Sequence, residues 1–218
     1  MQYVFLVILL GALAVGLGVL GWLGFAQRRR RRGLMRAAHH MGLKFSPEDP
    51  FELSQRYPGF VLASAGHSQR AENVLYGQHR GWLVRLCDYS FETGHGTQRT
   101  ARRYSLMVVD TDMELPATLM WHIQDAAQIP LEAAGPAARV GPWLVTGEVA
   151  FAAVLAEAFA ELGEQLPVSI QTSRRFIMLC SARRLRPAEL EGWLASAVAG
   201  LCRLRPAAAP ALSDGTRA

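Results

Sequence analysis

The segment 88–96 carries the densest group of side chains that could perform acid–base chemistry. Asp88 and Glu92 supply carboxylates and His95 an imidazole, and such groups held within hydrogen-bond reach can move the proton of a hydrolytic reaction. The same residue types also bond backbone N–H groups in turns. The sequence contains no P-loop, no G-x-S-x-G elbow and no H-E-x-x-H motif. We therefore prefer a structural role and assign no catalytic residue; these three residues are the candidates if the chain is an enzyme.

The six histidines predict no metal site. His39 and His40 are adjacent, and neighbours on a helix point about 100° apart, so both cannot easily reach one ion. We expect neither a metal nor a cofactor. The remaining histidines have no ligand partner at a suitable spacing: His67, His79, His95 and His122.

Three cysteines, an odd number without a C-x-x-C pair, favour buried reduced thiols over disulfides. They are Cys87, Cys180 and Cys202. A reducing compartment such as the bacterial cytoplasm is consistent with this pattern.

Residues 3–26 contain no charged side chain, and five consecutive arginines begin at Arg28. An α-helix rising about 1.5 Å per residue would cross a hydrocarbon core of roughly 30 Å over this length. A cleaved secretory signal would need a basic segment before its apolar core, and only Met1 and Gln2 precede this one. We therefore predict a transmembrane anchor over residues 1–27.

The arginine run sets the expected orientation, because basic flanks stay on the cytoplasmic side. We predict a single-pass protein of a bacterial inner membrane, with its N-terminus outside and everything after residue 27 in the cytoplasm. The arginines would contact anionic lipid headgroups, each contributing about 1 kcal/mol close to the surface. The predicted lipid-contacting residues are Arg28, Arg29, Arg30, Arg31 and Arg32.

Small residues within the apolar run could allow two anchors to pack together. Ala12 and Gly16 have small-xxx-small spacing, and so do Ala14 and Gly18. No strict G-x-x-x-G occurs, and glycine is common in membrane helices in any case. A homo-oligomer therefore stays an alternative to a monomer.

Charge is divided unevenly along the chain. The first 44 residues hold seven basic and no acidic side chains, whereas residues 45–218 hold 16 basic and 18 acidic ones. Nucleic-acid binders usually carry their basic excess on the folded module, so nucleic acid is disfavoured as a partner. Arginines in 99–103 and 174–186 would add to lipid attraction if they faced the membrane, but a solvated face balanced by glutamates is the preferred interpretation.

Residue periodicity predicts an α+β domain after the anchor. Residues 28–44 continue as a basic juxtamembrane helix that stops at Gly42. Asp49, Pro50 and Glu52 have the arrangement of a capping box, which predicts a short helix over 50–57. Period-two patterns then predict a meander with a tight turn at Arg80-Gly81. The predicted strands cover residues 60–65, 73–79, 82–91, 100–110 and 118–123.

The C-terminal part is predicted to add two amphipathic helices that pack on the mainly antiparallel sheet. An apolar stripe runs from Phe151 to Leu162, and a closing helix begins at Pro187. The domain would occupy residues 45–205, with a disordered tail over 206–218. The predicted strands here are 142–146, 168–172 and 176–180, the last two joined by a turn at Ser173-Arg174, with irregular structure over 125–142.

Several short motifs resemble those of a group of uncharacterised bacterial proteins with an N-terminal membrane helix and one cytoplasmic domain. The resemblance extends over residues 34–203 and fades around 118–138. It implies the same layout and no activity or catalytic residue. The motifs are Gly42-Leu43, Tyr57-Pro58-Gly59-Phe60, Asn73-Val74-Leu75-Tyr76-Gly77 and Asp88-Tyr89-Ser90-Phe91 with its Thr-Gly continuation.

These patterns favour a binding function over a reaction. An antiparallel sheet with edge strands offers a surface for strand addition. The preferred function is a membrane-anchored, non-catalytic cytoplasmic binding or scaffold domain whose partner is another protein. The alternatives are a membrane-tethered hydrolase-like enzyme that uses segment 88–95 and an anionic-lipid-binding module.

Overall fold

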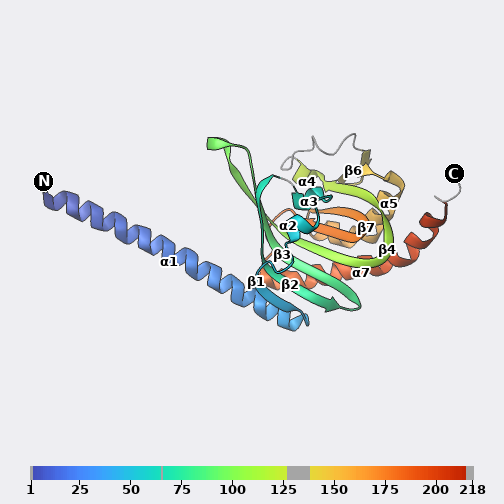
Figure 1. The fold of residues 1–218 in the computed structure, drawn as a ribbon, viewed down its shortest axis with the longest axis horizontal. Coiled ribbons are helices and arrows are strands. Elements are labelled where there is room, and N and C mark those ends of the chain that lie inside the picture. Colours follow the sequence, from blue (N-terminus) through green and yellow to red (C-terminus); the bar gives the residue numbers. More distant parts are fainter. Residues whose placement is uncertain (1, 65, 127–137, 215–218) are drawn as a thin grey trace.

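A long helix leaves one side of a compact sheet domain (Figure 1). The computed structural model describes residues 2–64, 66–126 and 138–214. The predicted α+β class is confirmed, with an N-terminal apolar helix followed by an antiparallel sheet and packing helices.

The N-terminal helix α1 (Gln2–His40) is unbroken from the apolar run to the domain. Among the described residues it is the one helix long and apolar enough to cross a membrane, and its apolar part is not buried by the rest of the chain. The predicted continuation past the arginines is confirmed. The helix ends before Gly42, whose φ of 71° lies in the left-handed region that glycine adopts without strain.

The described strands form one antiparallel sheet in the order β1-β2-β3-β4-β6-β5, with β7 also paired to β4. Arg80 and Gly81 both have positive φ, as the predicted tight turn between β2 and β3 requires. The strands are β1 (Lys44–Glu48), β2 (His67–His79), β3 (Trp82–Thr93), β4 (Thr100–His122), β5 (Ala138–Val140), β6 (Trp143–Gly147) and β7 (Val168–Ser181).

Helices and loops cover both faces of the sheet. One face, with Val84 and Leu86, packs against the C-terminal part of α1 and against α5, α6 and α7. The other face, with Tyr89 and Leu106, packs against the segment that contains α2 and α3. The helices are α2 (Leu53–Arg56), α3 (Val61–Ser64), α4 (Ile123–Ala126), α5 (Val149–Ala158), α6 (Ala160–Gln165) and α7 (Pro187–Asp214), with a 3₁₀ turn η1 (Gly96–Gln98).

Two local predictions between β1 and β2 are wrong. The Asp49 carboxylate accepts hydrogen bonds from the backbone N–H groups of Phe51 and Leu53, but Glu52 adopts a left-handed conformation, so only the short α2 follows. Within the segment predicted as a strand over 60–65, residues 61–64 form α3 instead, and residue 65 lies outside the described residues. Leu62 and Ala63 are buried on the sheet, and this packing overrides the weak strand preference of the run.

The strand predictions for β4 and β7 are too short, whereas β6 confirms the strand predicted over 142–146 within one residue. β4 extends to His122, so the strands predicted over 100–110 and 118–123 belong to one strand. The strands predicted over 168–172 and 176–180 are likewise one strand, β7, in which Arg174 has a positive φ at an irregularity in the pairing with β4. The closing helix begins at Pro187 as predicted and continues to Asp214. Its alanines over 207–209 favour helix, so the predicted tail from residue 206 is helical up to that point.

Candidate functional site

A buried ion pair joins α1 to the sheet. The guanidinium of Arg30 donates two hydrogen bonds to the carboxylate of Asp88 on β3, at 2.8 Å from Nε and 2.5 Å from Nη2. Asp88 is only 4 % exposed. A carboxylate removed from water in this way needs a charged partner, and the paired fork of an arginine matches it in geometry.

Two further side chains complete this group. The amide of Asn73 donates to Asp88 at 2.9 Å, and Nε of Arg184 lies 3.6 Å from the same carboxylate. Asn73 sits at an irregularity in β2 with a φ of 54°, a conformation that asparagine tolerates better than most residues. We call Arg30, Asn73, Asp88 and Arg184 the anchor joint.

The anchor joint also fixes the link between β7 and α7. Nη2 of Arg30 donates to the carbonyl of Leu185 at 2.9 Å, and the N–H of Leu185 donates to Oγ of Ser105 at 2.9 Å. Burial lowers the pKa of Arg184, the nearby Asp88 opposes this, and the neighbouring charges of Arg30 and Arg103 lower it further. Two guanidinium groups, those of Arg30 and Arg184, therefore face one carboxylate, and Arg103 lies near Arg184.

The sequence places Arg30 on the docked face of α1. Leu34, Ala38 and Met41 follow it at helical spacing, and all three are buried against the domain. Gly33 lies so close to Pro187 that a Cβ there would be 2.9 Å from the proline ring. The contact of α1 with the domain is thus continuous from Met41 back to Arg30.

The three acid–base candidates are not brought together. Asp88 and Glu92 are four residues apart on one extended strand, which separates their Cα atoms by about 13 Å. Glu92 accepts a hydrogen bond from Arg99, which lowers the pKa of this carboxyl. His95, beyond the strand, stacks on His67 with 5.5 Å between ring centroids. Each candidate has a structural contact of its own.

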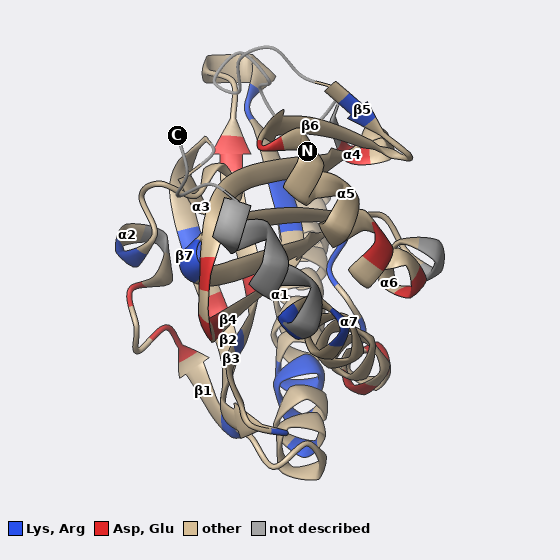
Figure 2. Cartoon of the chain, turned by 90° about the vertical axis from the view of Figure 1, so that its right-hand side faces the viewer, with Lys and Arg blue, Asp and Glu red and all other residues tan. Residues whose placement is uncertain are grey.

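The predicted lipid-contacting arginines have different surroundings. Arg28, Arg29 and Arg32 are exposed, Arg31 is half-buried, and Arg30 is engaged in the anchor joint. Lipid contact by the exposed members stays a prediction, whereas the Arg30 guanidinium faces Asp88. Figure 2 shows basic residues on successive turns of this part of α1.

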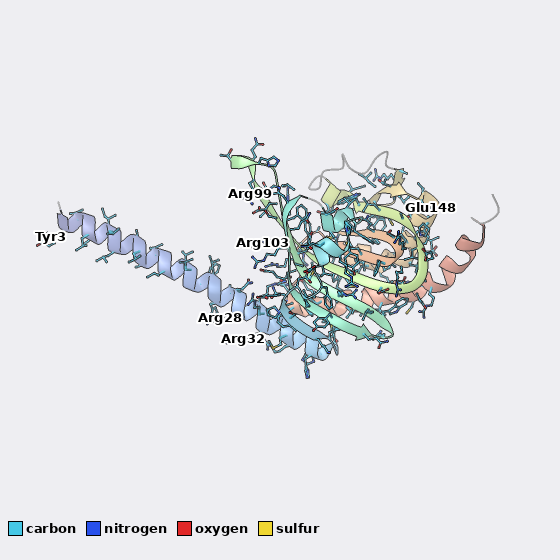
Figure 3. The ribbon with its side chains drawn as sticks, in the orientation of Figure 1. Tyr3, Arg28, Arg32, Arg99, Arg103 and Glu148 are labelled. Atoms are coloured by element: carbon cyan, nitrogen blue, oxygen red, sulfur yellow. The ribbon has the colours of Figure 1, made fainter. Side chains whose placement is uncertain are left out.

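The two arginine clusters do not lie on one face. Arg99 and Arg103 lie on the flank from which α1 leaves the domain (Figure 3), and Arg184 joins them there through Asp88. Arg174 and Arg175 lie in the middle of β7, at the irregularity in its pairing with β4, where Arg175 pairs with Asp110 at 2.6 Å. The preferred interpretation, a solvated face balanced by glutamates, agrees with the pairs Arg99–Glu92, Arg183–Glu189 and Arg186–Glu189. Attraction of the first group to lipid stays a prediction.

Within the described part of the chain, no group of three His, Cys, Asp or Glu side chains could hold a metal ion. All three cysteines are free. Cys87 and Cys180 are buried, and burial raises the pKa of both thiols. Cys202 is exposed, so the prediction of buried thiols is wrong for this residue because it lies on the outer face of α7.

No protein-family model matches the chain, and no curated protein matches it significantly. Its fold is similar to the crystal structure of the mycobacterial trehalose monomycolate transport factor A, TtfA, with a TM-score of 0.58 and 15 % sequence identity. The match covers 82 % of this chain and 94 % of that one. At this identity the similarity shows a shared fold.

Sequence reasoning selected Asp88 but not its partners. The signal that could have found Arg30 is its position one helical turn before Leu34, in the same series as Ala38. An arginine in line with a buried stripe, next to a domain with an isolated aspartate in an apolar strand, indicates a buried ion pair. Nothing in the sequence marks Asn73 or Arg184 as members of this group.

A second buried carboxylate gives a pH-dependent prediction. Burial raises the pKa of Asp125 to about 6, with a smaller opposing effect of Arg102. The native state then holds this proton more tightly than the unfolded chain, whose aspartates titrate near about 3.9, so the free energy of unfolding falls as the pH rises from about 4 to about 6. We expect Asp125→Asn to raise the free energy of unfolding by about 2 kcal/mol at neutral pH and to change little near pH 4. Thermal unfolding at the two pH values checks this, and equal stabilisation at both would contradict it.

Proposed function

We propose that this chain is a single-pass protein of a bacterial inner membrane whose cytoplasmic domain is a non-catalytic accessory module that binds a partner protein beside the bilayer. The observation that carries the proposal is the unbroken α1, which extends from the apolar run into the core and is locked there by the anchor joint. A flexible tether would suffice to keep an enzyme near a membrane. A docked, continuous helix also fixes the orientation of the domain.

The orientation follows from charge. Arg28, Arg29 and Arg32 flank the apolar run on the domain side, and basic flanks remain in the cytoplasm. The N-terminus would then lie outside. TtfA, a mycobacterial trehalose monomycolate transport factor, has a similar fold, and this similarity supports an accessory role.

The arrangement of the acid–base candidates supports a non-catalytic role. The carboxylate of Asp88 is occupied by Arg30 and Asn73, and Glu92 is occupied by Arg99. Strand addition at the edge β1 is limited because Pro47 has no N–H to donate. Exposed apolar side chains are better partner contacts, and Leu83 and Val149 are each more than 40 % exposed.

Photo-cross-linking in cells tests this proposal. A photoreactive phenylalanine analogue at Leu83 or Val149 of the full chain should yield a discrete product in the membrane fraction. A variant with a flexible Gly-Ser linker between Gln27 and Arg28 keeps α1 docked but frees the domain from the span, and it should lose most of that product. Absence of any product at both sites, or the same yield from the linker variant, would contradict the proposal.

A further inference from the structure

The hairpin formed by the ends of β3 and β4 projects from the domain on the side toward which α1 runs (Figure 1). On this hairpin an open groove of about 340 Å³ is rich in hydrogen-bond donors. Its polar lining consists of Ser68, Arg70, Ser90, Glu92, Arg99 and Arg103. We call it the hairpin groove.

The strand register places two arginines on either side of a serine. Ser90 pairs with Arg70 on β2 and with Arg103 on β4. Neighbouring strands are about 4.8 Å apart, so the two arginines start about 10 Å apart with a hydroxyl between them. Two guanidinium groups and a hydroxyl in this arrangement suit the oxygens of a phosphate group.

The charges of the groove are only partly balanced within the protein. Arg70 pairs with Glu72 at 2.8 Å, and Arg99 bonds Glu92. The guanidinium of Arg103 has no hydrogen bond or ion pair with the described residues, and it lies near enough to Arg184 to lower the pKa of that group. An anion beside Arg103 would relieve this repulsion.

The hairpin and the span extend from the Arg30–Asp88 contact toward the same side of the domain (Figure 1), so the bilayer surface is expected near the groove. Ser90 follows Asp88 on the same face of β3, two residues closer to the hairpin tip, which is an advance of about 7 Å. Four residues of α1 before Arg30 advance about 6 Å and reach Ala26, where the uncharged run ends. Figure 3 shows Arg99 and Arg103 on the same flank as Arg28 and Arg32, with Glu148 on the opposite one.

We propose that the hairpin groove binds the phosphate groups of anionic phospholipids in the same bilayer that holds α1. The groove gives the domain a second membrane contact, separate from the arginines that flank the span. With α1 fixed by the anchor joint, the hairpin meets the headgroups without a change of domain orientation. The inference rests on the membrane anchor of the proposed function and adds a lipid class and a binding site to it.

The test uses the full chain in lipid nanodiscs with a polarity-sensitive fluorophore at the hairpin. Thr97→Cys supplies the exposed labelling site, Cys202→Ser removes the exposed native thiol, and the other two cysteines are buried. Emission should shift to the blue in nanodiscs that contain phosphatidylglycerol, relative to phosphatidylcholine alone. High salt should reduce the shift, because exposed charges are screened.

Variants decide whether the groove causes this shift. Arg70→Gln/Arg99→Gln/Arg103→Gln should lose most of it, and Arg103→Gln alone a substantial part, with thermal stability little changed because these arginines are exposed. Arg174→Gln removes an exposed arginine in the middle of β7, which pairs with Leu115, twelve residues along β4 from Arg103, and it should retain the full shift. Equal emission in the two lipid compositions, or equal loss in the Arg174 control, overturns the proposal.

Inorganic phosphate distinguishes the two sources of the ligand. Added to the labelled chain in neutral detergent at constant ionic strength, it should leave the emission unchanged if headgroups arrayed at a surface are required. A saturable response to inorganic phosphate would assign the groove to a free anion and overturn the lipid assignment. The fraction of the chain incorporated into nanodiscs is measured separately from the emission. A chain that does not insert into the bilayer is therefore distinguished from one that inserts but whose hairpin groove does not bind lipid.

Discussion

Arg30→Ala is expected to lower the free energy of unfolding of the full chain by about 3 kcal/mol, because it leaves the buried carboxylate of Asp88 without its main partner. The hydrogen bond to the Leu185 carbonyl is lost as well. Thermal unfolding in detergent, followed by fluorescence of the buried Trp121 and Trp193, measures the effect.

Arg32→Ala is the matched control. Arg32 belongs to the same arginine run but is exposed, so its loss should change stability by less than about 0.5 kcal/mol. The double variant Arg30→Met/Asp88→Leu should recover only part of the stability. Replacing both members of a buried ion pair by apolar side chains is often neutral, but Asn73 and Arg184 also lose their contact with the carboxylate. Equal effects at positions 30 and 32 would show that the anchor joint does not hold α1 to the domain.

Leu34→Asp should have the largest effect of these variants. It should lower the free energy of unfolding by about 4 kcal/mol or more, because it places a carboxylate in the buried contact between α1 and the domain. Helix α1 would separate from the sheet while the span stays intact. Limited proteolysis of the full chain in nanodiscs should then cut between Gly33 and Gly42, where the docked helix is protected.

The neighbouring substitution Met35→Asp provides the comparison. Met35 is 54 % exposed, so the same change of charge one residue along the helix should cost little and leave the cleavage pattern unchanged. If both variants become sensitive to protease, the buried face of α1 has been assigned wrongly. If neither does, the docking contact contributes little to stability.

The features readable from the sequence were those set by local periodicity. The uncharged run, the continuation of α1 through Leu34 and Ala38, and the Arg80-Gly81 turn all depend on residues within two helical turns of one another. The sequence also drew attention to Asp88 through its polar neighbours. Its role could not be derived, because the partner Arg30 lies 58 residues away and meets it only after helix and sheet have packed.

The strand errors have a related cause. Polar residues at Ser173-Arg174 have the composition of a turn, yet β7 continues through them with one residue in a left-handed conformation. Pairing with β4 on both sides of this point holds the strand together. The hairpin groove could not be predicted from the sequence either, because Arg70, Ser90 and Arg103 become neighbours only through the strand register.

The distance between the span and the hairpin tests most directly whether α1 fixes the orientation of the domain. Spin labels at Leu23→Cys in the span and Thr97→Cys on the hairpin, in the Cys202→Ser background, report that distance in nanodiscs. A continuous docked helix predicts one narrow distribution, which becomes broad in Leu34→Asp. A distribution in the otherwise unaltered chain that is as broad as in Leu34→Asp would contradict a fixed orientation.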